Sequence, residues 1–443
     1  MKMKIIKKIS VIGIWLFLAL MNKQAVGQVW SLNQCLDTAQ LNNKQLAISR
    51  TSITISEQKQ EEVKASLIPK VAMNGDYKYY TNLPYQLMPS SIFGGPVGQF
   101  KEAQFGVPTN INANLQLSMP IFNAVLYNTV STAKIATVFS KLQYQKNEDQ
   151  LFYDITNLYY NAQILKQQEK FLDANLINSN ILLKNIQLLH EQLLAKNSDV
   201  SRVQLQVSQL TTAKINIISK YEQVLNMLKF SMGISLQRLI EVDPVILFQS
   251  TNNISYSNSV DIKIARTQFE LLNNELTTLK YSKLPTLALY GTYGTTGFGY
   301  NVKPNDFLKF FPIGLVGVQL SYPIFNGTIT NRKISQKKLD IKNSQLQISL
   351  AESQNEMQSQ NAVIQKSVTL GLVESNNKQI EQAQKIYNQS VIQLKEGVAN
   401  LTELLLADNA LREAQNNYLT SIIDYMKADL ELKKIKGNIS TKK

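Results

Sequence analysis

A tandem repeat constrains what this 443-residue chain can fold into more than any other feature. The octapeptide QLSMPIFN at 116–123 returns as QLSYPIFN at 319–326, with seven of eight positions identical at an offset of 203. Single residues recur in the same order upstream at an offset of 216 and downstream at 204, for example Tyr77 as Tyr293 and Leu228 as Leu432. The chain therefore reads as two copies of one structural unit, 28–245 and 246–443, the second ending in a basic tail. The change in offset gives the first copy a longer segment at 82–108, rich in proline and glycine, which is expected to be a loop.

Each copy contains a long helical stretch. No proline or glycine lies between Pro120 and Gly233, and apolar residues recur there at spacings of three and four, the pattern of a heptad seam. This predicts a helix over 130–195, roughly 66 residues and about 100 Å long. Asn197-Ser198-Asp199 is the expected turn and N-cap, after which a second helix returns. The second copy predicts the same hairpin, out over 331–396 and back over 401–436.

Strictly alternating segments precede each helical hairpin. Residues 110–119 place asparagine, glutamine and serine on one face and aliphatic side chains on the other, and 71–79, 286–293 and 314–322 resemble them. Ten residues with one apolar and one polar face match the strands of membrane barrels, although one such pair alone would equally fit a soluble hairpin. Four strands cannot close a barrel, since the smallest have about eight. Two, three or four chains would supply eight, twelve or sixteen strands, and a conducting barrel needs at least three chains.

The first 27 residues have the pattern of a cleaved signal peptide. Four lysines precede the apolar run Val11–Leu20, and Ala25-Val26-Gly27 forms a small-x-small cleavage site. The mature chain would carry 41 basic and 32 acidic residues, a net charge of +9, which is interpreted as a solubility feature. Export and the lack of a basic cluster with interleaved aromatics argue against nucleic-acid binding.

The scarcity of cysteine and histidine excludes several kinds of enzyme site. Cys35 is the only cysteine and His190 the only histidine, so a disulfide within the chain, a cysteine zinc cluster and a multi-histidine metal site are all excluded. No nucleophile–base set and no phosphate-binding glycine loop is recognisable. We expect no catalytic residues, no metal and no cofactor. Any energy for transport must come from other proteins.

The layout resembles the TolC family of outer-membrane efflux proteins over essentially the whole chain after residue 27. The motifs that carry the resemblance are Pro-Ile-Phe-Asn at 120–123 and 323–326, an aliphatic residue and proline before a strand (Ile68-Pro69, Leu284-Pro285), and the turn EGVANLTEL at 396–404. That turn is similar to the family's Gly-x-x-x-x-x-(Asp/Glu)-(Val/Leu)-Leu. The resemblance implies a mainly α fold with a membrane β-barrel, in which a homotrimer forms twelve strands in outer-membrane lipid and an α-helical tunnel in the periplasm.

The same resemblance implies a function and partners. The protein would be the exit duct of a tripartite efflux or type I secretion system in the outer membrane of a diderm bacterium. Its partners would be a periplasmic adaptor (membrane fusion protein) and an inner-membrane transporter of RND or ABC type. The two hairpin tips would contact the adaptor and gate the tunnel. The implied tip residues are Ala195, Lys196, Asn197, Ser198, Asp199, Val200, Gly397, Val398, Ala399, Asn400, Leu401, Thr402, Glu403 and Leu404.

Within the tips, Glu403 and its repeat partner Asp199 match the family's acidic position, so three copies of Glu403 would form an acid ring in the lumen. A second acidic position of some members is Leu406 here, and the first tip has Ala195-Lys196 in place of the family's glycine. Asp199 and Glu403 equally fit the first turn of a helix, where carboxylates stabilise the positive end. His190 is interpreted as a packed seam residue and Cys35 as a buried thiol.

One alternative from another class stays open. A periplasmic coiled-coil adaptor or structural protein without a membrane barrel would also contain long helices, but it would need only one hairpin. Carbonate or salt would release such a protein from membranes, whereas a barrel needs detergent. The transported substrate is not specified by the residues.

Overall fold

The repeat is visible element by element in the computed structural model, which describes residues 28–246, 259–437 and 439. The predicted signal peptide, 1–27, lies outside the described residues. The first copy contains α3 (Lys44–Ala65), β2 (Lys70–Tyr79), β5 (Thr109–Phe122), α4 (Ala124–Glu191) and α5 (Asn197–Met232). The second contains α6 (Val260–Tyr281), β7 (Thr286–Tyr300), β8 (Phe307–Ser321), α7 (Ile329–Lys395) and α8 (Leu401–Ile435). The equivalent long helices have 68 and 67 residues, and the returning helices 36 and 35.

By residue contacts the chain forms two compact units, each drawing on both copies of the repeat. A helical unit comprises the described parts of Met1–Ser52, Lys141–Ile264 and Ile348–Lys443. A sheet unit comprises Ile53–Ser140 and Ala265–Gln347. The repeat boundary at 245/246 stays a prediction.

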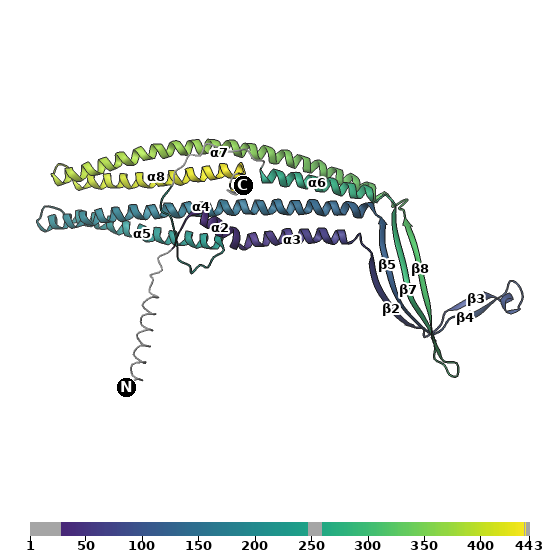
Figure 1. The fold of residues 1–443 in the computed structure, drawn as a ribbon. Coiled ribbons are helices and arrows are strands. Elements are labelled where there is room, and N and C mark those ends of the chain that lie inside the picture. The colour runs from purple at the N-terminus through teal and green to yellow at the C-terminus, as the bar shows by residue number, and fades with distance from the viewer. Residues whose placement is uncertain (1–27, 247–258, 438, 440–443) are drawn as a thin grey trace, which may run out of the picture. The chain divides into compact units, whose positions relative to one another are not determined.

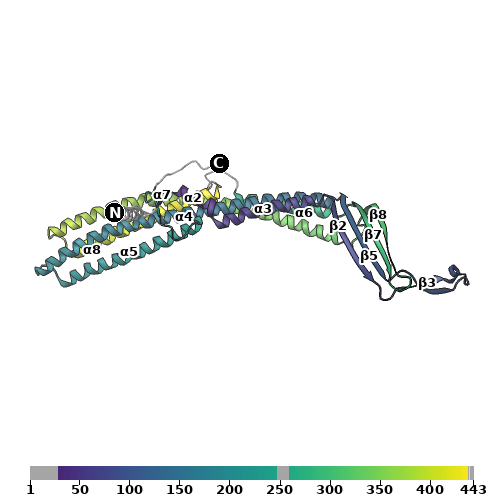
Figure 2. The ribbon, with the colours of Figure 1, turned by 60° about the horizontal axis from the view of Figure 1, so that its bottom comes forward.

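The sheet unit contains one four-stranded antiparallel sheet in the order β2-β5-β7-β8 (Figures 1 and 2). The strands of the two copies are joined where β5 pairs with β7. Among the described strands, β2 and β8 each pair on one side only, so both edges of the sheet are open. The four strands predicted from sequence alternation are confirmed, with β5, β7 and β8 extending beyond the predicted ranges.

The segment 82–108 differs from the predicted loop. It contains strand β3 (Tyr85–Pro89), a 3₁₀ turn η1 (Ser90–Phe93) and strand β4 (Phe100–Gln104), which pair as an antiparallel hairpin. Two strands of only five residues, one of them ending in proline, leave too short an alternation to be recognised from sequence. In both views the β3–β4 hairpin lies beyond the end of the sheet where β2 ends and β5 begins (Figures 1 and 2).

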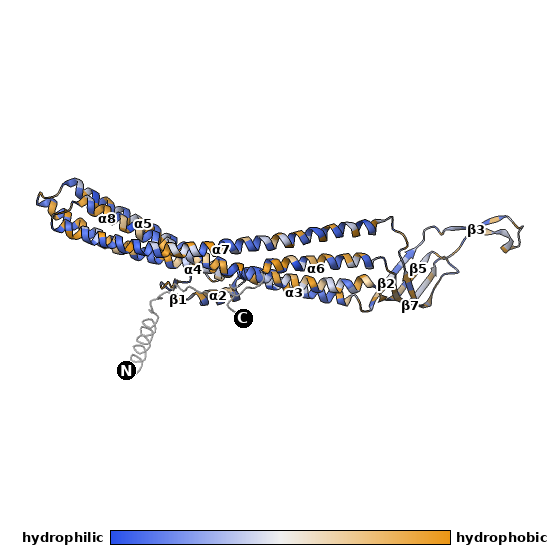
Figure 3. Cartoon of the chain, turned by 90° about the horizontal axis from the view of Figure 1, so that it is seen from above, coloured by the Kyte–Doolittle hydropathy of each residue, from blue (hydrophilic) through white to orange (hydrophobic). Residues whose placement is uncertain are grey.

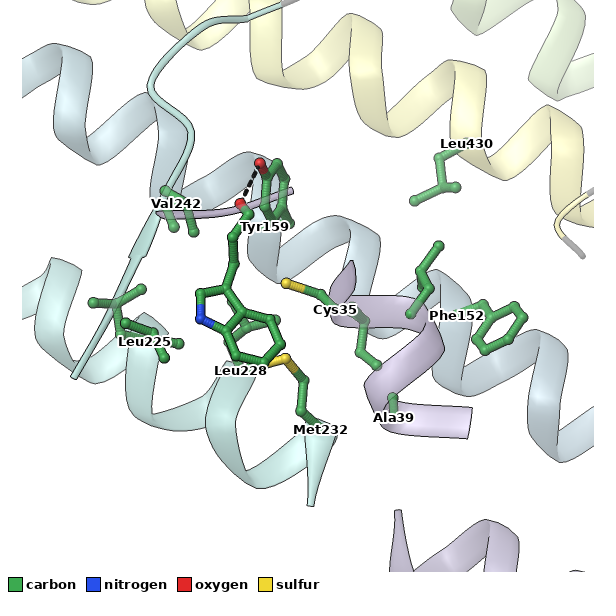
Figure 4. Packing of buried hydrophobic residues seen from close by; sticks show 14 of the residues in the cluster. Cys35, Ala39, Phe152, Tyr159, Leu225, Leu228, Met232, Val242 and Leu430 are labelled. Carbon is green, nitrogen blue, oxygen red and sulfur yellow. Dashed lines mark hydrogen bonds between the residues drawn. The ribbon is translucent and has the colours of Figure 1, made fainter. Parts of the chain in front are cut away.

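The helical unit has its main core where α2 (Leu32–Asn42) and a two-stranded parallel sheet meet α4 and α5. That small sheet joins β1 (Gln28–Trp30) and β6 (Ile240–Val242). Cys35, Ile155 and Leu228 are fully buried there, and Figure 4 shows Cys35 packed near Leu228 and Met232. The Tyr159 hydroxyl donates to the Trp30 carbonyl at 2.9 Å. Burying one aliphatic side chain, such as that of Ile155 or Leu228, stabilises the fold by about 1.5–3 kcal/mol.

The Cys35 side chain is fully buried in this core. Burial raises the pKa of the thiol to about 12, so the thiol stays neutral. The prediction of a buried cysteine is therefore confirmed. Across the portion of the chain that the structure describes, none of the helices is both long and apolar enough to cross a bilayer. Hydrophilic and hydrophobic residues interleave along the long helices (Figure 3).

Candidate functional site: the sheet faces and the hairpin tips

The sheet has one continuous apolar face. Residues that pair across all four strands place Val71, Leu117, Gly291 and Val316 in one row of this face, and Met73, Leu115, Tyr293 and Gly314 in the next. Five of the side chains in these two rows are exposed, with Val316 at 81%; the others are Val71, Met73, Leu115 and Tyr293. All ten residues of β2 are exposed, so β2 is uncovered on both faces. A soluble domain normally buries such a face against a second layer.

The opposite face is polar on β2 and β5, where side chains form a ladder of hydrogen bonds. The Asn74 amide donates to Gln116 Oε1 at 3.1 Å, and the Asn112 amide donates to both oxygens of Asp76 at 3.1 and 3.3 Å. The Thr296 hydroxyl extends the ladder to β7 by donating to Asn112 Oδ1 at 2.9 Å. Asp76 also pairs with Lys78 at 3.3 Å. Such a surface suits contact with water.

The hairpin tips make the same turn with different residues. Gly397 has a φ of +71°, and its N–H donates to Leu394 O at 3.2 Å. At the equivalent position, 204 residues earlier, Leu193 has a φ of +61°, and its N–H donates to His190 O at 2.9 Å. The first tip therefore makes its left-handed turn at Leu193, two residues before the Ala195-Lys196 pair at which the sequence placed the missing glycine.

The first turn also differs from the prediction in its boundaries. Helix α4 ends at Glu191 and α5 begins at Asn197, so Lys196 is the N-cap residue and Asn197-Ser198-Asp199 is the first turn of α5. The chain leaves α4 at the left-handed residue Leu193, which carries no glycine or proline signal. His190 lies beside this turn, with Nδ1 2.9 Å from the carbonyl oxygen of Ala195.

The structure brings the two tips together. Ile186, Val203 and Leu401 form a buried cluster against which Ala195 and Val200 pack. The Arg202 guanidinium bridges the tips, donating to Thr402 Oγ1 at 3.4 Å and lying 3.8 Å from Asp199 Oδ1. Leu404 is buried, whereas Leu193 is 91% exposed and Val398, at the second tip, is also exposed. The exposed ends therefore present apolar side chains.

Both acidic tip residues participate in helix capping. Asn400 Oδ1 accepts from the Glu403 N–H at 3.0 Å, and the Asn400 amide donates back to Glu403 Oε1 at 3.1 Å. Asp199 Oδ2 accepts from the Lys196 N–H at 3.4 Å. Glu403 remains exposed, so its charge faces solvent in this chain. Whether Glu403 forms an acid ring stays a prediction.

Sequence reasoning missed a buried polar group that joins the two helical hairpins. Gln206 of α5 donates to Ser179 Oγ of α4 at 3.2 Å and to Asp408 of α8. Asp408 is 4% exposed and pairs with Arg412 at 3.0 Å. Burial raises the pKa of Asp408, and the Arg412 charge opposes that rise. Asp408 follows the buried residue Leu401 by one heptad, so the helical period places this acidic residue on the buried side of α8.

The long helix α7 leaves an apolar stripe uncovered. Its exposed members recur at spacings of seven and four, which places them along one side of the helix. They are Leu339, Leu346, Leu350, Met357, Ile364 and Val368. A stripe of this length on a long helix is typical of contact with another helix.

No protein-family model matches the sequence, and no curated protein is similar enough to be identified as a relative. Solved structures are similar over nearly the whole chain. The outer membrane protein VceC of Vibrio cholerae has a TM-score of 0.76 at 15% identity, over 92% of this chain and 96% of its own. The Campylobacter jejuni CmeC outer membrane channel has a TM-score of 0.73 at 14% identity, over 92% and 85%. The Neisseria gonorrhoeae MtrE outer membrane channel, in its open state, has a TM-score of 0.69 at 15% identity, over 92% and 88%.

The chain therefore has the fold of the TolC-family outer-membrane channels, as its resemblance to that family predicted. At these identities the similarity establishes the fold. The function is argued from the sheet, the helices and the tips.

Proposed function

We propose that this protein is a passive exit channel of the outer membrane of a diderm bacterium. The observation that carries the proposal is the single-layer sheet, apolar along one face and amide-lined on part of the other. Lipid can cover the apolar face and water can fill the polar side, which is the arrangement of a transmembrane barrel wall. The strands have 10 to 15 residues, enough for a tilted crossing of about 9–11 residues.

Closing this wall requires other copies of the chain. Open strand edges are not tolerated in the hydrocarbon region, so β8 of one copy must pair with β2 of the next. Three copies give twelve strands, while two would give eight and no room for a water-filled lumen. The uncovered stripe of α7 supports the same assembly, because neighbouring copies offer it a helical partner.

The channel itself would act without chemistry. The asparagine and glutamine side chains of β2 and β5 would line the lumen with neutral hydrogen-bonding groups that hold no single solute tightly. Contact between the tips through Arg202 and Thr402 would belong to the closed state of the periplasmic end. Opening would separate these contacts when a periplasmic adaptor engages the exposed tip residues Leu193 and Val398.

The adaptor and an inner-membrane transporter of RND or ABC type complete the proposed exporter. Photocrosslinking in living cells tests this directly, with a photoreactive residue at Val398 and a matched control at Val97, which lies between η1 and β4 in the hairpin segment. We expect the Val398 probe to capture an adaptor and the Val97 probe to capture none. Equal recovery of the same partners from both positions, or release of the protein from membranes by carbonate, would contradict the proposal.

A further inference from the structure

The polar face of the sheet changes character on its last strand. On β2 and β5 this face carries amides and charges, but on β8 the same face carries the apolar strip Phe307, Phe311, Ile313 and Leu315, before returning to polar side chains at Gln319 and Ser321. Phe311 is 51% exposed, and its ring lies 6.0 Å from that of Phe298 on β7. Lipid can cover the apolar face of β8, but an aqueous lumen cannot cover this strip.

A second uncovered apolar surface lies on the β3–β4 hairpin. Its register places Tyr85, Leu87 and Phe100 on one side together with Glu102, and we call this side the hairpin face. These three side chains are 68%, 69% and 64% exposed. The opposite side carries Lys101, which lies over the ring of Phe93. An isolated two-stranded hairpin is marginally stable, so a surface for it to pack on would explain its apolar side chains.

The position of the hairpin indicates which copy of β8 it can reach. The hairpin is inserted between β2 and β5, and in its own chain β8 lies three strand positions from β2 and two from β5, about 10–14 Å at roughly 4.8 Å per strand. In a closed barrel the neighbouring copy's β8 is only one position from β2, and its end near Phe307 lies at the same end of the sheet as Tyr79. The neighbour's strip is therefore the nearer one.

The charges of the two surfaces are complementary. Glu102 is the only charged residue on the hairpin face, and Lys309 is the only one on the strip's side of β8. Lys309 projects beside the Phe307 ring at 6.0 Å, within the strip. An apolar patch with one acid would thus meet an apolar patch with one base.

We propose that the β3–β4 hairpin of one copy packs its hairpin face on the apolar strip of β8 in the neighbouring copy, with Glu102 paired to Lys309. This contact forms an apolar collar that fastens adjacent subunits at the end of the barrel away from the helices. The inference rests on the proposed oligomeric barrel, to which it adds a specific intersubunit surface.

Site-specific crosslinking between differently tagged copies tests the contact. Cys35 is buried and serves as an unreactive background. One copy carries Leu87→Cys and the other Phe311→Cys, and a short thiol-reactive crosslinker is added to membranes. We expect covalent heterodimers carrying both tags, and several-fold less product with the control Phe310→Cys, whose side chain points to the apolar face.

Two outcomes of this crosslinking experiment would contradict the proposed contact. Equal product with Phe310→Cys, or crosslinks joining only Leu87→Cys copies to each other, would overturn the collar. Amine crosslinking of the same membranes distinguishes failure of the hairpin contact from failure of the oligomeric barrel. Oligomers that persist without the Leu87–Phe311 product would refute only the hairpin contact. Loss of all oligomers would refute the barrel as well.

A charge reversal supplies an independent readout. We expect Glu102→Lys to lower the temperature at which the detergent-resistant oligomer dissociates, and Lys309→Glu in the same chain to restore most of that loss. Additive losses in the double variant would overturn the proposed ion pair.

Discussion

At the scale of single residues, the two tips show one backbone turn made by different side chains. A left-handed φ is free of strain for Gly397 but costs a non-glycine residue about 1–2 kcal/mol, which Leu193 bears. Leu193 is almost fully exposed, so packing offsets little of that cost.

Replacing Leu193 by glycine should therefore stabilise the protein. We expect Leu193→Gly to raise the free energy of unfolding by about 1 kcal/mol, because it removes the strain. Gly397→Leu should lower it by about 1–2 kcal/mol, since an added Cβ meets no atom within 4 Å and the cost lies in the left-handed backbone. Thermal unfolding followed by circular dichroism measures both, and destabilisation by Leu193→Gly would contradict this explanation.

Two substitutions distinguish the effect of the Glu403 charge on ion selectivity from the role of its side chain in helix capping. Glu403→Gln keeps an acceptor for the Asn400 amide and removes the charge, whereas Glu403→Ala removes both. We expect both variants to reduce the cation preference of the purified channel, measured from reversal potentials in planar bilayers under a salt gradient. A loss in the alanine variant alone would assign Glu403 to helix capping only.

Asp149 predicts a pH dependence of stability. Its pKa is raised to about 6, first by burial and then by Glu148, against the opposing charges of Lys263 and Lys434. A raised pKa means that the folded state binds the proton more tightly than the unfolded chain. The contribution of Asp149 is thus most favourable near pH 4, is lost as the pH rises to about 6, and stays lost above that pH.

Asp149→Asn should remove this dependence. At pH 7.5 we expect the variant to be more stable than the natural protein by about 1–2 kcal/mol, a value reduced for the partial exposure of the side chain. Near pH 4 the two should differ little. Thermal unfolding across this range provides the comparison, and a stability difference that does not change with pH would exclude Asp149 as the responsible group.

At the scale of elements, polar residues at seam positions hold the two hairpins of one chain together. Asp408 connects Gln206 of α5 to Arg412 of its own helix, and the Asn175 amide of α4 donates to Gln415 of α8 at 3.0 Å. Buried polar contacts of this kind define one register between helices, because a shifted helix would leave them unpaired.

Removing Asp408 should loosen α8 from the first hairpin. We expect Asp408→Ala to cost about 2–3 kcal/mol, because it leaves the Gln206 amide and the Arg412 guanidinium without their acceptor. Asp424→Ala, at an exposed position of the same helix, is the matched control and should change stability little. The check is the unfolding midpoint together with proteolysis of the hairpins, and equal effects of the two substitutions would argue against a role for the polar seam.

The elements themselves could largely be predicted, because their signals are local. The alternation at 71–79 and 110–119 predicts both the strands and the character of their two faces. The absence of glycine and proline between Pro120 and Gly233 predicts the long helices of the first copy. The turn at Leu193 could not be predicted, since no residue type there favours a left-handed backbone. The Gln206–Asp408 contact joins residues 202 positions apart, and only the unusual polarity of a seam position pointed to it. The roles of the tip residues stay predictions.

At the scale of the whole molecule, the sheet and the helix α7 leave surfaces that a single chain does not cover. An uncovered apolar face, two open strand edges and an uncovered stripe on α7 each leave surface that one chain cannot satisfy. In the proposed barrel, lipid and neighbouring copies would cover all of them.

Adjacent residues of β8 test the assignment of the two faces. Val318 lies on the apolar face and Gln319 on the polar face of the same strand. We expect Val318→Lys to impair insertion, at a cost of up to about 2–4 kcal/mol per chain near the bilayer centre. Gln319→Lys should be tolerated. Membrane fractionation with heat-stability analysis of the oligomer checks both, and equal tolerance would refute a lipid-facing role for Val318.

The most direct measurement is native mass spectrometry of the protein extracted with detergent from the outer membrane. We predict a single assembly of three chains, which corresponds to a barrel of twelve strands. A monomer or a dimer that resists dissociation would contradict a conducting barrel, and so would recovery of the protein without detergent.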